Sequence, residues 1–105
     1  MLITNTETIA GREIVESLGL VKGNSIRARH IGSDIVSGLR QLVGGEMKEY
    51  GKMLQEARSL AMDAMIEEAE KLGADAVVNV RFSTSSIMQG AAEVLVFGTA
   101  VKLGK

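Results

Sequence analysis

A chain of 105 residues has room for one domain, residues 1–105, and its 12 lysines and arginines against 13 aspartates and glutamates leave almost no net charge. A near-neutral chain has no general attraction to nucleic acids or anionic membranes, so neither is an expected partner. The absence of cysteine excludes disulfides, thiolate metal sites and cysteine nucleophiles. With no signal-peptide pattern and no apolar run of the ~18 residues that a membrane span needs, we expect a cytoplasmic protein.

The predicted core is made of small and branched aliphatic residues. Hydrophobic residues make up 46% of the chain, but aromatic residues only 3%, and there are six methionines. Such a core buries less apolar area per residue than an aromatic one. We therefore expect association to supply part of the stability.

The first part of the chain predicts a short strand, a long strand and a short helix. Residues 2–4 suit a small edge strand that enters a loop. Residues 13–29 contain β-branched residues and two glycines, which favours one long kinked strand over two strands joined at 22–24. Ser33 is a candidate N-cap for a short helix that ends at Gly44, where a glycine-rich corner precedes the next helix.

The strongest helical pattern runs from Lys52 to Leu72. Its apolar arc is wider than the ~100° stripe of an ordinary surface helix, which indicates contact with the chain's own sheet and with a second surface. The alanines in this arc are also the best helix formers, so propensity alone explains them equally well. Arg58 and Glu68 lie inside the arc and are expected to pair or to extend towards solvent. The central stripe of the arc consists of Leu54, Ala57, Ala61, Met65 and Leu72.

Two further strands are predicted after Gly73, which stands at the C-terminus of the long helix. Residues 76–85 alternate with a period near two, with Val78, Val80 and Phe82 on one face. A connection at 88–91 leads to residues 92–103, which are apolar on both faces. Both faces of this last strand are therefore expected to be covered.

The element order predicts an α+β fold of two layers, an antiparallel three-stranded sheet packed against one long helix, with an additional short helix. Gly98 has no side chain to pack, so it marks a bulge or a close approach by another backbone. One long helix covers only one side of such a sheet. The second apolar face of the last strand therefore predicts a partner subunit.

Local motifs recur along nearly the whole chain. They are Asp34-Ile35 before Gly38-Leu39-Arg40, Gly44-Gly45-Glu46 with Tyr50, Ala57-Arg58 with Ala61, Leu72 to Val77, Val80-Arg81-Phe82, and Glu93 before Gly98-Thr99-Ala100-Val101. In combination they resemble the YbjQ-like family of small bacterial and archaeal proteins. The resemblance implies a dodecin-like β-α-β-β subunit, assembly as a homopentamer with extra short strands at the subunit contacts, and the family label of heavy-metal binding without established catalytic residues.

His30 and Asp34 are the only candidate metal ligands, and they are weak ones. Their spacing of four can place two ligands on one helical face, but no third ligand stands nearby. Soft metals prefer thiolate and imidazole, and the chain has one histidine. Symmetry could bring several copies of His30 together. The identity of any metal, cofactor or small ligand is not specified by the sequence.

The remaining site candidates are charged residues in apolar or strand surroundings. Structural ion pairs are the favoured interpretation of these residues. The resemblance raises Arg58, Arg81 and Glu93 as ligand contacts. We therefore expect an oligomeric binding or structural module rather than an enzyme. The alternative is an enzyme whose carboxylates, with Glu68 and Glu93 as candidates, and serines form a site at a subunit interface.

Overall fold

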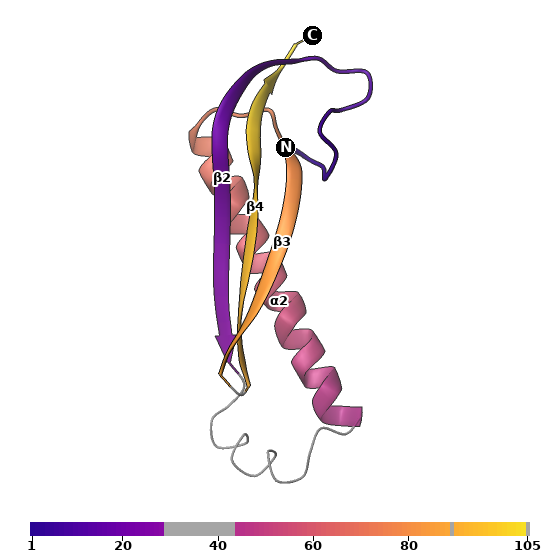
Figure 1. Ribbon diagram of the computed structural model, residues 1–105, viewed down its shortest axis with the longest axis vertical. Coiled ribbons are helices and arrows are strands. Elements are labelled where there is room, and N and C mark those ends of the chain that lie inside the picture. Colours follow the sequence, from indigo (N-terminus) through magenta and orange to yellow (C-terminus); the bar gives the residue numbers. More distant parts are fainter. Residues whose placement is uncertain (29–43, 89, 105) are drawn as a thin grey trace.

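The computed structural model describes residues 1–28, 44–88 and 90–104, and its shape is elongated, with extents of 57 × 23 × 16 Å. Helix α2 lies obliquely against one face of a four-stranded sheet (Figure 1). This arrangement confirms the predicted α+β class and its two layers. The elements are β1 (Leu2–Ile3), β2 (Ile14–Ala28), α2 (Gly44–Lys71), β3 (Ala76–Met88) and β4 (Ala91–Leu103).

The sheet is mixed, so the prediction of three antiparallel strands is wrong in two respects. Its strand order is β1-β3-β4-β2, in which β2, β3 and β4 are antiparallel and β1 runs parallel to β3. The predicted edge strand at residues 2–4 does form, and it joins the sheet because Leu2 pairs with Ala76 and Ile3 with Val77. The predicted short helix after Ser33 lies outside the described residues.

Strand β2 is one long strand with irregularities, as predicted. Its register against β4 shifts between Ile14 and Glu16 and again between Ser17 and Gly19. Gly19 has a φ of 105°, a conformation that costs glycine little and other residues much more. The kink therefore falls at the first of the two glycines that suggested it.

A bulge in β3 changes which way its valines face. Asn79 has a φ of 56° and lies in the register shift between Val78 and Arg81, opposite Gly98 of β4. Val78 consequently packs with Ala76 on the face away from α2, whereas Val80 belongs to the core beneath α2. The prediction that Val78 and Val80 share a face is therefore wrong. The prediction that Gly98 marks a bulge or a close approach is confirmed, since a Cβ there would lie 2.9 Å from the Val78 carbonyl oxygen.

Helix α2 begins at Gly44, ahead of the strong helical pattern that starts at Lys52, so the glycine pair opens the helix and does not form a corner before it. Its C-terminus is the predicted one. Gly73, with a φ of 77°, donates to the Glu70 carbonyl at 3.0 Å, and the amide of Ala74 donates to the Ala69 carbonyl at 3.1 Å. These two bonds are the Schellman pattern, which satisfies carbonyls at the helix end.

The core between α2 and the sheet is thin because small residues line it. Ala57, Ala61, Met65 and Ala69, each four residues apart, are fully buried. A Cβ on Gly23 of β2 would lie 2.1 Å from the Ala61 carbonyl oxygen, so the helix backbone lies directly on this strand. The buried stripe is thus narrower than the apolar arc of the sequence, and Leu72, predicted to be part of it, is 47% exposed.

Candidate functional site

The face of the sheet opposite α2, called the open face here, is packed against no helix in residues 1–28, 44–88 and 90–104. The N-terminal segment (residues 4–13) covers only one end of it, where Ile9 packs with Ile14 and Val101. Beyond that end, the cross-strand register aligns side chains from β2, β4 and β3 in rows. They form a basic row (Lys22, Phe97, Arg81), a central row (Asn24, Leu95, Ser83) and an acidic row (Ile26, Glu93, Ser85).

The open face combines apolar side chains with charges of both signs. Leu20 is 65% and Ile26 60% exposed, while Leu95 and Phe97 on the central strand are half-buried. Lys22 and Arg81 flank Phe97 on either side. Because neighbours on one face of a strand are ~6.6 Å apart, the acidic row lies about 13 Å from the basic row. The open face can therefore bind a partner that is apolar in the middle and oppositely charged at its two ends.

Of the three predicted ligand contacts, the structure brings two to the open face and leaves the third elsewhere. Arg81 and Glu93 belong to the basic and acidic rows, and Asn24 donates to Glu93 through Nδ2 at 3.2 Å. Arg58 lies exposed on α2, in the other layer. Glu68 is also exposed on α2, so one chain does not bring it together with Glu93. A site that used residues of both layers together would need more than one chain, and the role of these residues as ligand contacts stays a prediction.

Arg81 also holds the N-terminal segment in place. Its Nη1 donates to the Asn5 carbonyl at 2.8 Å and to the Val80 carbonyl at 3.0 Å. The backbone of the segment bonds to the bulge in β3, since Asn79 donates to the Thr6 carbonyl at 2.9 Å and Val80 to the Thr4 carbonyl at 3.1 Å. The position of the N-terminal segment, and thus the boundary of the open face, depends on the bulge.

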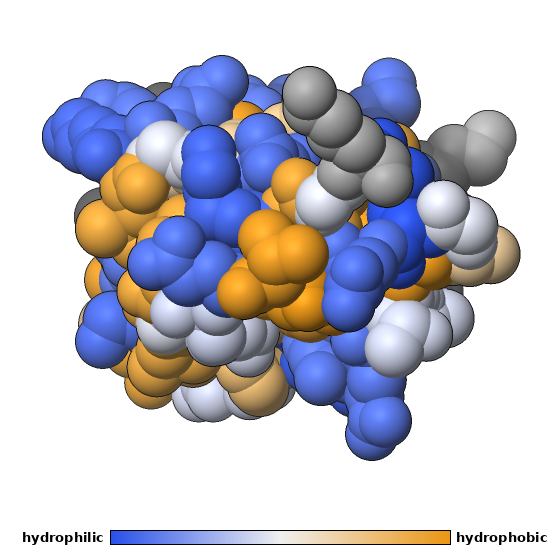
Figure 2. Space-filling view, turned by 90° about the horizontal axis from the view of Figure 1, so that it is seen from above, coloured by the Kyte–Doolittle hydropathy of each residue, from blue (hydrophilic) through white to orange (hydrophobic). Residues whose placement is uncertain are grey.

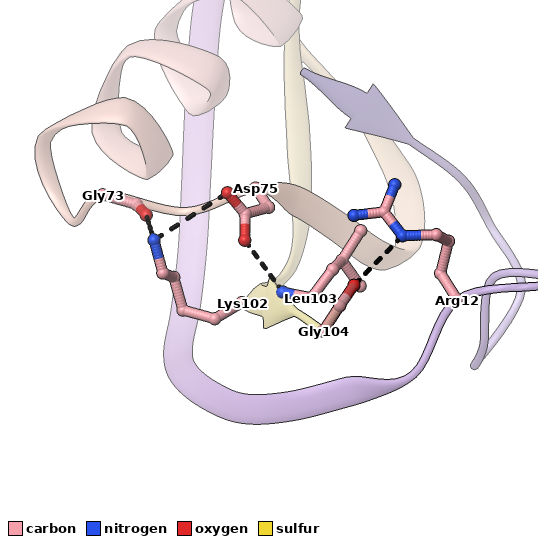
Figure 3. Close-up of polar contacts among 6 residues, drawn as sticks. All are labelled: Arg12, Gly73, Asp75, Lys102, Leu103 and Gly104. Carbon is pink, nitrogen blue, oxygen red and sulfur yellow. Dashed lines mark hydrogen bonds and ion pairs between the residues drawn. The ribbon is translucent and has the colours of Figure 1, made fainter.

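A polar cluster joins the C-terminus of α2 to the end of β4 (Figure 3). Asp75 accepts from the Leu103 amide at 2.8 Å and lies 3.8 Å from the Lys102 ammonium, which donates to the Gly73 carbonyl at 2.9 Å. A cation at this position is favourable because the carbonyl end of a helix carries partial negative charge. The cluster fastens the helix end to the sheet.

Open grooves lined by described residues lie at opposite ends of the long axis. One groove, about 520 Å³, adjoins the Asp75 cluster. The view from above shows apolar side chains between hydrophilic ones on that end of the molecule (Figure 2). This groove is lined by Met1, Leu2, Arg12, Asp75, Leu103 and Gly104. The second, about 550 Å³, lies between β2 and α2, where Arg27 pairs with Glu56. Its other lining residues are Lys52, Gln55, Ser59 and Leu60.

Metal ligands are sparse in this chain. Among residues 1–28, 44–88 and 90–104, no three histidine, cysteine, aspartate or glutamate side chains are grouped as a metal site requires. The candidates His30 and Asp34 lie outside the described residues. With no cysteine and one histidine in the sequence, the donor set does not fit a thiolate or multi-imidazole site within one chain.

The sequence did not single out Lys22 and Phe97, although they complete the basic row. The alternation of Leu20, Lys22, Asn24 and Ile26 in β2 was a usable signal, because alternate residues of a strand share a face. The cross-strand partners could not be found in this way, since two register shifts between β2 and β4 and two between β3 and β4 set the pairing. In the described part of the chain, no helix combines the length and apolar character needed to cross a membrane.

Residues 1–104 match the model of a protein family described as "putative heavy-metal-binding". Among similar sequences, a "UPF0145 protein" of Methanosarcina acetivorans is 61% identical over 103 residues, which is 98% of this chain and 97% of that protein. A "UPF0145 protein" of Thermosipho africanus is 59% identical over 105 residues, 100% of this chain and 97% of that protein. Neither name states an activity.

The fold also resembles a solved structure. The crystal structure of a protein of unknown function from Pediococcus pentosaceus superposes with a TM-score of 0.61 at 17% identity, covering 99% of this chain and 98% of that one. At this identity the likeness concerns the fold alone. It supports the α+β architecture.

Proposed function

The chain belongs to the YbjQ family, whose model it matches over residues 1–104, and from that premise we propose that it works as a homo-oligomeric binding or structural module in which other copies cover the open face. The observation that carries the proposal is the exposure of Leu20 and Ile26, at 65% and 60%, beside the half-buried Leu95 and Phe97. Burying a large aliphatic side chain contributes ~1.5–3 kcal/mol. Covering these two residues would therefore contribute about 1–2 kcal/mol each.

The strand edges supply a second contact between copies. In the described part of the chain, β2 ends the sheet on one side, and on the other side β1 pairs only with Ala76 and Val77 of β3. Unpaired strand edges are templates for pairing with another chain. The two edges differ, so pairing one with the other is a head-to-tail contact, which avoids filaments only if it closes into a ring. Five copies per ring is the number that the family resemblance implies.

The test is whether the mass of the assembly falls when a charged side chain is introduced into the open face. Leu20→Lys places an ammonium on an exposed apolar position of the open face, and Asp63→Lys places one on the charged side of α2, outside its apolar arc. Both proteins should remain folded by circular dichroism. By multi-angle light scattering we expect Leu20→Lys to be smaller than the wild type and Asp63→Lys to have the wild-type mass. An unchanged mass for Leu20→Lys would show that the open face is not covered by another copy.

Heavy-metal binding, the second candidate, follows from the family description alone. Because carboxylates seldom hold Zn²⁺ or Cu²⁺ tightly without imidazole or thiolate, any tight site in this chain would use its one histidine. Calorimetric titration of wild type and His30→Ala with Zn²⁺ distinguishes the two cases. Submicromolar binding that the substitution abolishes would establish the site, and no binding by the wild type would exclude it for zinc.

A further inference from the structure

We propose that the basic row of the open face binds a small planar aromatic anion, whose ring stacks on Phe97 and whose acidic group pairs with Lys22 and Arg81. The inference rests on the proposed function, because it names the class of ligand that the open face of each copy takes. It goes further by giving the site its residues and its chemistry. One chain supplies all three side chains, so each copy of a closed ring carries its own site.

The three side chains are direct neighbours in one row of the sheet. Phe97 on the central strand β4 pairs with Lys22 of β2 on one side and with Arg81 of β3 on the other. Residues directly opposite each other on antiparallel strands have Cβ atoms ~4.5–5.5 Å apart. Lysine and arginine have long, flexible stems, so both cationic groups can reach a ligand that lies on the Phe97 ring.

The basic row carries two positive charges with no carboxylate beside them. In the part of the chain that the structure describes, neither Lys22 nor Arg81 forms an ion pair. Glu93 on the same face is two rows away, at about 13 Å, and it already accepts a hydrogen bond from Asn24 at 3.2 Å. An anion over Phe97 would relieve the repulsion between the two cations, and this charge complementarity favours an anionic ligand.

Arg81 has donors left for a ligand, although it also holds the N-terminal segment. Its bonds to the Asn5 and Val80 carbonyls both use Nη1, and Nε and Nη2 donate to no protein atom among the described residues. A guanidinium presents its N–H groups in a planar fork that matches two oxygens of a carboxylate or a phosphate. The bond to Asn5 restrains the arginine before a ligand arrives, which lowers the entropy cost of binding. It also makes the N-terminal segment a rim beside the basic row.

Phe97 favours an aromatic ligand over a simple inorganic anion. The chain has two phenylalanines and one tyrosine, and Phe97 lies half-buried on the open face between the two cations. Offset stacking of two rings contributes more than the burial of their area alone. In the adjacent central row, the half-buried Leu95 can contact a second ring, with the Ser83 hydroxyl at its edge. Because one row spans ~6.6 Å along the strands, the two rows accommodate one or two fused rings.

Titration of the wild-type protein with 2-naphthoate, a fluorescent planar carboxylate, tests the proposal. We expect saturable binding with one site per chain. 2-Naphthamide has the same ring system without the charge, and it should bind at least ~10-fold more weakly. Lys22→Gln removes one of the two cations and should weaken naphthoate binding about 10-fold. Phe97→Leu removes the stacking surface and should weaken it about 3-fold or more.

Lys71→Gln is the matched control, because it removes the same charge from an exposed lysine in the last turn of α2, in the other layer. It should bind 2-naphthoate as the wild type does. Circular dichroism and light scattering show whether each variant keeps the fold and the mass of the wild type. Lys22 is exposed, so Lys22→Gln remains decisive even where Phe97→Leu is destabilised.

Three results would each refute the site. They are a wild-type assembly that does not bind 2-naphthoate at millimolar concentration, equal affinities for 2-naphthoate and 2-naphthamide, and equal affinities of Lys22→Gln and Lys71→Gln for 2-naphthoate. These outcomes differ from failure of the proposed function itself, in which the wild type would be a monomer of 11.2 kDa whether or not it binds 2-naphthoate.

Discussion

Gly23 is the position where the packing of α2 on the sheet is most sensitive to one added carbon atom. In Gly23→Ala the new Cβ would lie 2.1 Å from the Ala61 carbonyl oxygen and 2.5 Å from the Met65 amide nitrogen. Both are backbone atoms in the middle of a helix, so no side-chain rotation relieves the contact. The helix and the strand must separate.

The size of the effect follows from the distances. An ordinary contact begins at 3.4 Å, so the nearest pair must move apart by about 1.3 Å, which is 3.4 minus 2.1. Overpacking that side chains can relieve costs ~1–3 kcal/mol, and here the backbone has to move. We therefore expect a loss of about 3 kcal/mol or more in the free energy of unfolding. For a domain of this size that corresponds to a melting temperature lower by at least ~12 °C.

Gly51→Ala is the matched control, since it is the same substitution, made in the helix that Gly23 contacts, with the opposite expected sign. Gly51 lies exposed in α2, with no atom within 4 Å of the added Cβ. Alanine in a helix interior is favoured over glycine by ~1 kcal/mol, so this variant should melt a few degrees above the wild type. Both are compared by differential scanning calorimetry at one protein concentration, because association shifts the melting temperature. If Gly23→Ala unfolds within ~1 kcal/mol of the wild type, the close approach of α2 to β2 is wrong.

Three other substitutions test separate parts of the fold. Asn79→Val should lose ~1–2 kcal/mol in urea unfolding because a β-branched residue disfavours a φ of 56°, whereas Asn79→Gly should stay within ~1 kcal/mol; equal losses would argue against the bulge. Arg81→Ala removes the bond to the Asn5 carbonyl, so limited proteolysis within residues 4–13 should accelerate, with Arg58→Ala as the unchanged control. Val96→Asp buries a carboxylate at a position with 0% exposure beneath α2, so we expect no cooperative unfolding transition, and a folded variant would contradict this placement.

The features that depend on neighbouring residues could be predicted from the sequence. The middle of the helical stripe, Ala57, Ala61 and Met65, is buried as expected, and Gly73 ends the helix with a left-handed φ. The connection near Gly90 and the extent of β4 also follow from local turn chemistry and alternation. In each case the physical cause acts within a few residues, which is the range over which periodicity is informative.

The features that depend on pairing between distant segments could not be predicted. The parallel pairing of Leu2 with Ala76 joins residues that are 74 positions apart in the sequence (76 minus 2). The two-residue strand β1 is too short for its sequence pattern to specify this pairing. The bulge at Asn79 reverses the alternation of β3, and no glycine or proline marks that position. Consequently Arg81 and Glu93 could be proposed as site residues, but the basic and acidic rows that contain them require the register of three strands.

The mass of the wild-type protein in solution tests the central claim most directly, because the proposed covering of the open face requires more than one copy of the chain. Multi-angle light scattering during size-exclusion chromatography should give a whole-number multiple of 11.2 kDa, about 56 kDa for a ring of five. The same multiple should persist on tenfold dilution in the micromolar range if the ring is closed. A single species of 11.2 kDa at micromolar concentration would contradict the account.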